Sequence, residues 1–215
     1  DVHTDEIIFT SGGTEGNNLV LFGLVKNKPA HIITSKIEHT SVLEPCRQLE
    51  REGFAVTYLP VNHDGLVAPA ALAAALRPET VLVSIGYVNS EIGVIQPLRA
   101  LTKVIRNFKK LQATSDKLQA NSYPHFHTDA CQAPRFLDCR ASTLGVDLMT
   151  LNSDKIYGPQ GVGCLYVRRG INLQPILRGG GQERGLRSGT ENVSAAVRFA
   201  KALELCVKLK NKESE

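Results

Sequence analysis

Residues 7–25 read IIFTSGGTEGNNLVLFGLV. Ile7–Thr10 is a short run of β-branched and aromatic residues, which predicts a strand. Thr14–Val25 carries apolar residues at helical spacing, and the turn between the two segments contains Gly12 and Gly13. A strand that leads through a tight turn into a helix is the building unit of an α/β protein.

The same alternation continues along the chain and predicts an α/β fold with a largely parallel sheet. The predicted strands are Ile7–Thr10, His31–Ser35, Ala55–Pro60, Thr80–Tyr87, His125–Asp129, Asp147–Leu151 and Val162–Val167. The predicted helices are Thr14–Val25, Ser41–Glu52, Pro69–Leu76, Leu98–Leu111 and Asn192–Leu209. Residues 111–124 are polar and have no apolar period, which predicts a surface excursion between a helix and a strand.

Length and composition are those of an ordinary soluble globular protein, with 215 residues, 42% hydrophobic and 21% charged. No run approaches the roughly 18 to 20 apolar residues of a membrane span, and the N-terminus lacks the pattern of a secretory signal. The net charge of +4 is spread along the chain, too weak a field to favour nucleic acid or an acidic membrane. We therefore expect a soluble chain with no nucleic-acid or membrane partner.

The chain has five cysteines, which are widely spaced and form no CxxC pair: Cys46, Cys131, Cys139, Cys164 and Cys206. An odd number at such spacing indicates neither a disulfide framework nor a zinc site, so we expect no metal. A reducing compartment suits this pattern, and we expect a cytoplasmic location. Residue 1 is not Met and the chain stops after an apolar-periodic segment, which favours a piece of a longer protein.

Ligands of an open α/β sheet bind beyond the carboxyl ends of the strands, so the residues after each strand are candidates for a site. The turn at Ser11–Asn18 leads into a helix, where free N–H groups and the helix dipole favour an anion such as phosphate. It has neither the glycine spacing of a dinucleotide fingerprint nor the Lys-Ser/Thr pair of a Walker loop. Taken alone, such a turn is more often only a tight connection.

Functional side chains also follow other predicted strands. His39 follows the second, Asn89 the fourth, Asp129 and Gln132 the fifth, and Lys155 the sixth. Each has an ordinary alternative, such as an exposed histidine, an aspartate that caps a helix or a surface lysine. Together, an anion-binding turn, a ring for stacking, a carboxylate and an inward lysine are the parts of a pyridoxal phosphate site. There, Lys155 forms the Schiff base and Asp129 keeps the pyridine nitrogen protonated.

Six motifs occur in order between Ile8 and about Leu205: FTSGGTEGNNL, HIITSKIEHTSVLEPCRQLEREGFAVTYLPV, VSIGYVNSEIGVIQPL, HTDACQ, KIYGPQGVGCLYVRRG and GGGQERGLRSGTEN. In this set the chain resembles the cysteine desulfurase and selenocysteine lyase family, class V of the fold-type I pyridoxal phosphate enzymes. The set is highly specific. The resemblance implies that residues 1–215 form the cofactor-binding large domain, a three-layer α/β/α fold with a mainly parallel, mixed sheet.

The resemblance implies two catalytic residues and three further contacts to the cofactor ring. Lys155 is then the Schiff-base lysine, and His39 stacks on the ring and exchanges protons near it. Asp129 pairs with the pyridine nitrogen, and Gln132 faces the phenolic oxygen of the ring. Asn89 lies close to that oxygen and to the substrate carboxylate.

The phosphate contacts that the resemblance implies come from two subunits. Gly13 and Thr14 hold the phosphate, and Thr190 reaches the phosphate of the neighbouring subunit, which implies a homodimer. Many family members read Ser-x-His-Lys before the IYGP segment, whereas this chain has Asn152-Ser153-Asp154-Lys155. Asn152 still donates a hydrogen bond there. Asp154 brings a negative charge toward the phosphate, which weakens binding unless its side chain turns away or Ser153 substitutes.

The family also has a segment before the first strand and a small C-terminal domain. The persulfide-forming cysteine and the arginine that binds the substrate carboxylate then lie beyond position 215, and none of the five cysteines takes the nucleophile's place. The leading hypothesis is a pyridoxal phosphate-dependent cysteine desulfurase that converts L-cysteine to alanine. Its sulfur passes as a persulfide to a sulfur-acceptor or scaffold protein, for iron–sulfur cluster or thio-cofactor biosynthesis. We expect little or no turnover by these 215 residues alone.

Two alternatives stay open. The chain is also consistent with a selenocysteine lyase, whose substrate is selenocysteine, because the motifs do not separate the two activities. It is consistent as well with a non-catalytic scaffold of the same fold, which Asp154 favours. A dehydrogenase is the weakest hypothesis, because the glycine fingerprint and the ribose-binding acid that follows it are absent from the sequence.

Overall fold

A computed structural model of the chain describes residues 2–115 and 124–213. Seven strands form one sheet in the order β1-β9-β8-β7-β4-β2-β3. Their bounds are β1 Ile7–Thr10, β2 His31–Ser35, β3 Ala55–Leu59, β4 Thr80–Ser84, β7 His125–Asp129, β8 Leu148–Asn152 and β9 Gly163–Val167. A separate hairpin pairs β5 (Val88–Asn89) with β6 (Val94–Ile95). The prediction of a mainly parallel, mixed sheet is confirmed.

One strand of the seven-stranded sheet runs against the others. Strands β3, β2, β4, β7 and β8 pair in parallel, whereas β9 is antiparallel to both β8 and β1. Strand β1 therefore runs in the same direction as β8. As a result, the segments after β1, β2, β4, β7 and β8 all leave the sheet at the same edge.

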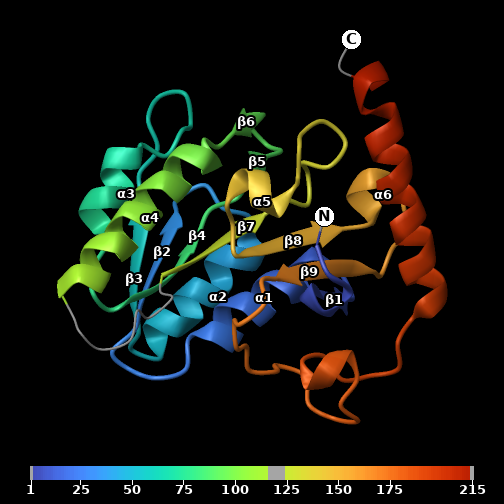
Figure 1. Ribbon diagram of the computed structural model, residues 1–215, viewed down its shortest axis with the longest axis horizontal. Coiled ribbons are helices and arrows are strands. Elements are labelled where there is room, and N and C mark those ends of the chain that lie inside the picture. The colour runs from blue at the N-terminus through green and yellow to red at the C-terminus, as the bar shows by residue number, and fades with distance from the viewer. Residues whose placement is uncertain (1, 116–123, 214–215) are drawn as a thin grey trace.

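Helices cover both faces of the sheet (Figure 1). Helices α1 (Gly13–Leu24) and α2 (Thr40–Arg51) pack on one face, and α3 (Pro69–Ala75), α4 (Leu98–Ser115) and α5 (Ala141–Leu144) on the other. Three short 3₁₀ turns, η1 (Thr4–Glu6), η2 (Asp154–Ile156) and η3 (Glu183–Gly185), lie in the connections. Helix α6 (Val193–Glu213) lies beyond the β1 and β9 edge.

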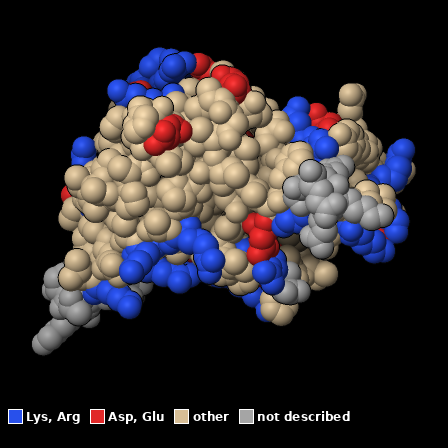
Figure 2. Space-filling model, turned by 90° about the horizontal axis from the view of Figure 1, so that it is seen from above, with Lys and Arg blue, Asp and Glu red and all other residues tan. Residues whose placement is uncertain are grey.

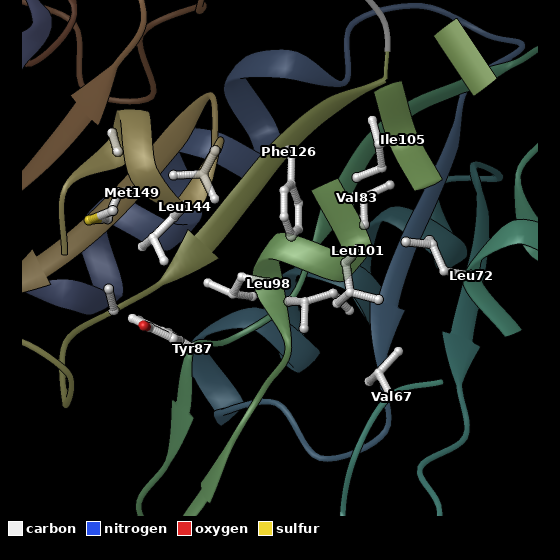
Figure 3. Close-up of a cluster of buried hydrophobic side chains, with 14 of the residues drawn as sticks. Val67, Leu72, Val83, Tyr87, Leu98, Leu101, Ile105, Phe126, Leu144 and Met149 are labelled. Atoms are coloured by element: carbon white, nitrogen blue, oxygen red, sulfur yellow. The ribbon is translucent and has the colours of Figure 1, made fainter. Parts of the chain in front are cut away.

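Neighbouring residues on the buried strands point into two different cores. Ile32 packs with α1 and α2, whereas Ile33 packs with the helices on the opposite face. Leu82 and Val83 divide in the same way. Figure 3 shows this second core, in which Phe126 of β7 lies between Leu144 of α5 and Ile105 of α4. Because successive strand residues face opposite ways, a sheet covered on both sides needs continuous apolar runs, which these strands have.

Several predicted boundaries differ from the structure. The strand predicted over Thr80–Tyr87 ends at Ser84, although the N–H groups of Ile85 and Tyr87 still bond to carbonyls of His127 and Asp129. Residues 111–115, predicted as part of a surface excursion, continue helix α4. Leu, Gln and Ala are good helix formers, and adding turns to an existing helix costs little. The rest of that excursion, residues 116–123, lies outside the described residues.

No helix of the described part of the chain is both long enough and apolar enough to cross a membrane. Helix α6 contacts the body through Phe199 and Ala202, while Val193 and Val197 remain exposed. On the face in Figure 2, Lys and Arg side chains form several separate groups around a broad area of uncharged residues. The charge on this face is therefore distributed and not gathered in one basic surface.

Candidate functional site

A cavity of about 310 Å³ opens at the edge where β1, β2, β4, β7 and β8 end. Eight of the ten predicted site residues line it: Gly13, Thr14, His39, Asn89, Asp129, Gln132, Asn152 and Lys155. Each follows or ends one of these strands, so the common strand direction brings together residues that lie far apart in the sequence. The other two predicted residues, Asp154 and Thr190, do not line the cavity.

The first turn of α1 forms the wall predicted to bind an anion. Its N-cap residue is Gly12, whose lack of a side chain leaves the first-turn N–H groups without a side-chain cap. The Asn152 side chain lies over this turn, with its Cβ 3.7 Å from the place that a Cβ on Gly13 would take. On the other side, the Sγ atom of Cys131 would be only 2.7 Å from such a Cβ. Only glycine allows this approach of α1 to β7 and β8.

Asp129 ends strand β7, and hydrogen bonds fix both of its carboxylate oxygens. Oδ1 accepts the backbone N–H of Cys131 at 3.0 Å, and Oδ2 accepts Nδ2 of Asn17 at 2.7 Å. The alternative in which Asp129 caps a following helix is wrong, because the chain turns there and α5 begins only at Ala141. The carboxylate is thus oriented by donors from two elements.

His39 is the N-cap of helix α2. Its Nδ1 atom accepts the backbone N–H of Ser41 at 3.1 Å and lies 2.7 Å from the Ser41 hydroxyl. The side chain therefore satisfies one of the free donors at the helix start, as Ser, Asp or Asn does at other helices. This bond also fixes the imidazole ring at the wall of the cavity.

Lys155 lies in the 3₁₀ turn η2, which follows β8. Its Nζ is 3.2 Å from Oδ2 of Asp154, and both side chains are partly exposed. The carboxylate of Asp154 therefore lies against the lysine and not in the cavity wall. Ser153 does not take its place in the wall, since its side chain is fully buried and packs near Gly158.

The segments after β2 and β4 are tied to each other across the cavity mouth. Asn89 donates through Nδ2 to the carbonyl of Ile37 at 2.8 Å, and its Oδ1 accepts the N–H groups of Glu91 and Ile92. The β5–β6 hairpin that carries Asn89 is thereby attached to the segment before His39. Gln132 also lines the cavity.

Glu38 is a cavity residue that the sequence did not single out. Ser35 Oγ donates to its Oε1, and the N–H of Gly86 donates to its Oε2 at 2.9 Å. Burial raises the pKa of this carboxyl to about 7, and Asp129 adds to the effect, while Ser35 and Gly86 oppose it. At neutral pH the site therefore holds a carboxyl close to its titration midpoint.

None of the five cysteines is paired in a disulfide, and four are fully or nearly buried. Burial raises the pKa of Cys46, Cys139 and Cys164 to about 12. It raises the pKa of Cys131 well above its usual value too, and the neighbouring Asp129 contributes. Because the thiolate is the reactive form, the four cysteines with a raised pKa are poor nucleophiles: Cys46, Cys131, Cys139 and Cys164. Among the described residues, no group of His, Cys, Asp or Glu is suited to hold a metal ion.

Thr190 belongs to a segment that is fastened to β1 and α1. Arg187 bonds through Nε to Glu15 at 2.8 Å, and the N–H of Phe9 donates to Glu183. Burial opposes ionisation of Glu15, but Arg187 and Ser11 more than offset it, so its pKa lies below the usual value. Thr190 itself is exposed, on the outside of its own chain's cavity.

The model of the aminotransferase class-V family matches residues 1–215. The chain belongs to this family. The resemblance seen in the motifs is therefore confirmed over the whole sequence.

Curated relatives of this class-V chain carry the name cysteine desulfurase IscS. One from Dictyoglomus turgidum is 45% identical over 99% of this chain and 51% of its own length. One from Mannheimia succiniciproducens is 47% identical over 94% of this chain and 48% of its own length. The chain thus spans about half the length of the curated relatives it matches.

Solved structures agree with the family assignment. A NifS-like protein superposes with a TM-score of 0.89 at 36% identity, covering 98% of this chain and 55% of that one. SspA, solved in complex with cysteine, superposes with a TM-score of 0.85 at 38% identity, covering 94% and 56%. The fold of this chain is therefore shared with a little over half of each of these solved structures.

The residues of this class-V site fit pyridoxal phosphate by their chemistry. The uncapped first turn of α1 and the amide of Asn152 supply donors for a phosphate. Asp129 presents an oriented carboxylate suited to a protonated ring nitrogen, and Lys155 presents a primary amine. The absence of a Cβ at Gly13 lets the uncapped turn lie against Cys131 and Asn152 in the cavity wall, with its N–H groups available to an anion.

Proposed function

We propose that this chain is the cofactor-binding large domain of a pyridoxal phosphate-dependent cysteine desulfurase. The observation that carries the proposal is the meeting of Lys155, Asp129, His39 and the α1 turn in one cavity. The relatives named cysteine desulfurase support the reaction, and SspA in complex with cysteine supports L-cysteine as substrate. Nothing comparable favours selenocysteine.

Different residues of the cavity bind different parts of pyridoxal phosphate. The N–H groups at the start of α1, with Thr14 and Asn152, bind the phosphate, while Asp129 binds the ring nitrogen. His39 covers the ring, and Lys155 supplies the amine for covalent attachment. When bound, pyridoxal phosphate supplies an electron-withdrawing ring that makes the α-carbon of an attached amino acid acidic.

The chain's own residues then account for the movement of protons. Once the amino group of the substrate replaces it in the covalent attachment, Nζ of Lys155 would be free to act as the base for the proton on the α-carbon of the substrate, because it is the lysine amine of the cavity wall. His39 holds or accepts a proton through its Nε2, since Nδ1 is engaged with Ser41. A cysteine thiolate would attack the sulfur of the substrate, forming the S–S bond of a persulfide as the C–S bond breaks. The electron pair of the broken bond would stay on the β-carbon, which takes up a proton, and the product would leave as alanine. We assign that thiolate to none of Cys46, Cys131, Cys139 and Cys164, whose thiols stay protonated.

Cofactor binding is tested on the purified chain. Titration with pyridoxal phosphate is expected to produce the visible absorption band of a lysine-bound cofactor, and borohydride reduction should leave the label on Lys155 in a mass-spectrometric peptide map. Lys155→Ala should abolish the band and the label. The matched control Lys36→Ala removes an exposed lysine that does not line the cavity, and it should keep both. A chain that gives no band, or one labelled equally after Lys155→Ala, contradicts the proposal and favours the scaffold alternative.

The full activity, its partners and its location belong to the same proposal. We propose that the parent protein is a homodimer that delivers sulfur to an acceptor or scaffold protein, and the exposed position of Thr190 outside its own cavity supports the dimer. The unpaired cysteines support a cytoplasmic location. Sulfide release from L-cysteine in the presence of dithiothreitol measures turnover. For these 215 residues alone we expect little or none.

A further inference from the structure

Asn17 is a polar side chain in the apolar, buried face of helix α1. It is fully buried, and Val20, Leu21 and Leu24 follow it on the same face. A buried amide costs free energy unless its groups form hydrogen bonds, and its Oδ1 has no partner among the described residues. A buried side chain with an unpaired oxygen lowers the stability of the fold, so its presence at this position needs an explanation other than stability.

The amide nitrogen of Asn17 joins two residues of the cavity wall. Its two hydrogens go to Asp129 Oδ2 at 2.7 Å and to Ser41 Oγ at 2.8 Å. The orientation of the amide follows from the partner, because an ionised carboxylate only accepts hydrogen bonds. The nitrogen must therefore face Asp129, and the oxygen is left unpaired.

Ser41 passes the connection on to His39. Since Ser41 Oγ accepts a hydrogen from Asn17, its own proton is free for Nδ1 of His39, 2.7 Å away. The backbone N–H of Ser41 also points to Nδ1. With two donors directed at it, Nδ1 carries no proton, and the neutral imidazole carries its hydrogen on Nε2.

We propose that Asn17 and Ser41 are positioning residues that couple Asp129 to His39, fixing the imidazole with its proton on Nε2 and the carboxylate in one orientation. We call the four hydrogen-bonded side chains, Asp129, Asn17, Ser41 and His39, the relay. They come from α1, the start of α2 and the end of β7, so the relay also fixes these three elements relative to one another. That Asp129 and His39 contact the cofactor rests on the proposed function. The relay itself is a property of the chain alone.

The relay is tested by nitrogen NMR of His39 in the cofactor-free chain, with spectra recorded over a pH series so that the signals of the uncharged ring are identified. The unchanged chain should show an unprotonated, hydrogen-bonded Nδ1 and a protonated Nε2. Ser41→Ala should move the Nδ1 signal toward that of a nitrogen without a hydroxyl donor, and Ser41→Thr should restore it. Asn17→Ala should also move the signal, although Asn17 does not touch His39, because the Ser41 hydroxyl then loses its orientation.

Two comparisons distinguish an effect through the Ser41 hydroxyl from a nonspecific change in the structure of the cavity. Asn17→Ala added to Ser41→Ala should change the His39 signal no further, because both act through the same hydroxyl. Ser90→Ala is the matched control, since Ser90 lines the same cavity and, within the described part of the chain, forms no hydrogen bond to Asn17, Ser41, His39 or Asp129. An unchanged Nδ1 signal in Ser41→Ala, or a signal shift in Ser90→Ala equal to it, overturns the proposal. Ser41→Ala keeps the test decisive even where Asn17→Ala fails to fold.

The holoprotein gives the second readout. We expect Ser41→Ala to raise the dissociation constant of pyridoxal phosphate about tenfold, as the loss of one oriented hydrogen bond predicts, and Ser41→Thr to recover most of it. If NMR shows the relay but the chain does not bind pyridoxal phosphate, the coupling of Asp129 to His39 stands and the proposed function is wrong. If Ser41→Ala alters the His39 signal but binds pyridoxal phosphate with an unchanged dissociation constant, the relay exists but does not contribute to cofactor binding.

Discussion

Glu38 is a carboxyl residue of the cavity whose pKa is raised into the neutral range. Its pKa of about 7 lies above the ordinary value of 4.5, so the folded state binds a proton more tightly than the unfolded state. Stability from this group is present at low pH and is lost as the pH rises through about 7. Because the carboxyl also faces the cavity, we expect a loss of about 1–2 kcal/mol between pH 5 and pH 8.

Urea unfolding at a series of pH values measures this loss. Glu38→Gln, which cannot ionise, should flatten the stability profile over that interval. Glu91→Gln removes an exposed carboxyl from the same cavity and should leave the profile as it is. A profile that falls as steeply in Glu38→Gln as in the unchanged chain would rule out Glu38 as the cause.

Gly13 is the residue at which one methyl group should disturb the phosphate turn. In Gly13→Ala the new Cβ would lie 2.7 Å from Sγ of Cys131, so the start of α1 must move away from β7. We expect about tenfold weaker binding of pyridoxal phosphate, as measured by absorbance titration. Adding Cys131→Ala removes the obstructing sulfur. The double variant should bind pyridoxal phosphate about 1 kcal/mol more tightly than the sum of the two single-variant effects predicts. Strict additivity would mean that the contact with Cys131 is not the cause.

The sequence identified the residues that follow strands but not those that support them. His39, Asp129 and Lys155 were found because each stands just after an apolar run. Asn17 lies within a helix and not after a strand, and the signal that reveals it is a polar residue on a buried helical face. Ser41 and Glu38 needed the fold, since their partners lie on other elements and no local pattern indicates them.

At the scale of elements, periodicity predicted the long segments and missed the short ones. The bounds of β1, β2 and β7 were predicted correctly. For β2 the reason is a β-branched run that is buried along its whole length. The two-residue strands of the β5–β6 hairpin and the four-residue α5 were missed, since neither is long enough to show a period. The length of α4 was also underestimated, because its last residues are polar and show no apolar stripe.

Two buried histidines cross-link neighbouring strands through hydroxyl groups. His127 of β7 lies between Ser84 of β4 and Thr150 of β8, at 2.8 and 2.9 Å. His31 of β2 lies between Thr80 of β4 and Thr57 of β3. Burial lowers the pKa of each histidine to about 4. Both therefore occur as neutral rings that join five adjacent strands of the sheet.

This arrangement predicts acid destabilisation of the sheet. The unfolded histidines bind protons below about pH 6.5 while the folded ones do not, so stability falls as the pH drops from about 6.5 to 4. The sign is opposite to that of Glu38, which allows the two effects to be separated. His127→Gln should lower stability at pH 7 and reduce the further loss between pH 7 and pH 5 in urea unfolding. His63→Gln, at a histidine with 88% of its side chain exposed, should leave that loss unchanged. A full loss retained in His127→Gln contradicts the assignment.

At the scale of the molecule, the reversed strand β9 separates the site from the segment that carries Thr190. The chain leaves the amino-terminal edge of the sheet through residues 168–178 and returns to β1 and α1, where Glu15 fastens it through Arg187. Thr190 is thus exposed beside the start of α1 but outside its own cavity. If Thr190 contacts a cofactor, the contact is to the cofactor of a second copy of the chain, as the proposed homodimer requires.

Complementation between two defective chains tests this arrangement. Lys155→Ala lacks the amine for attachment, and Thr190→Ala should bind pyridoxal phosphate weakly because the partner's phosphate loses a donor. In a mixed dimer, the site that keeps Lys155 receives its threonine from the Lys155→Ala chain and is complete. Unfolding and refolding an equimolar mixture should therefore yield tight binding at roughly a quarter of all sites, whereas each variant alone yields none. Sedimentation must show a dimer in parallel. A monomer, or a mixture that binds no better than Thr190→Ala alone, would remove Thr190 from the site and with it the shared-site dimer.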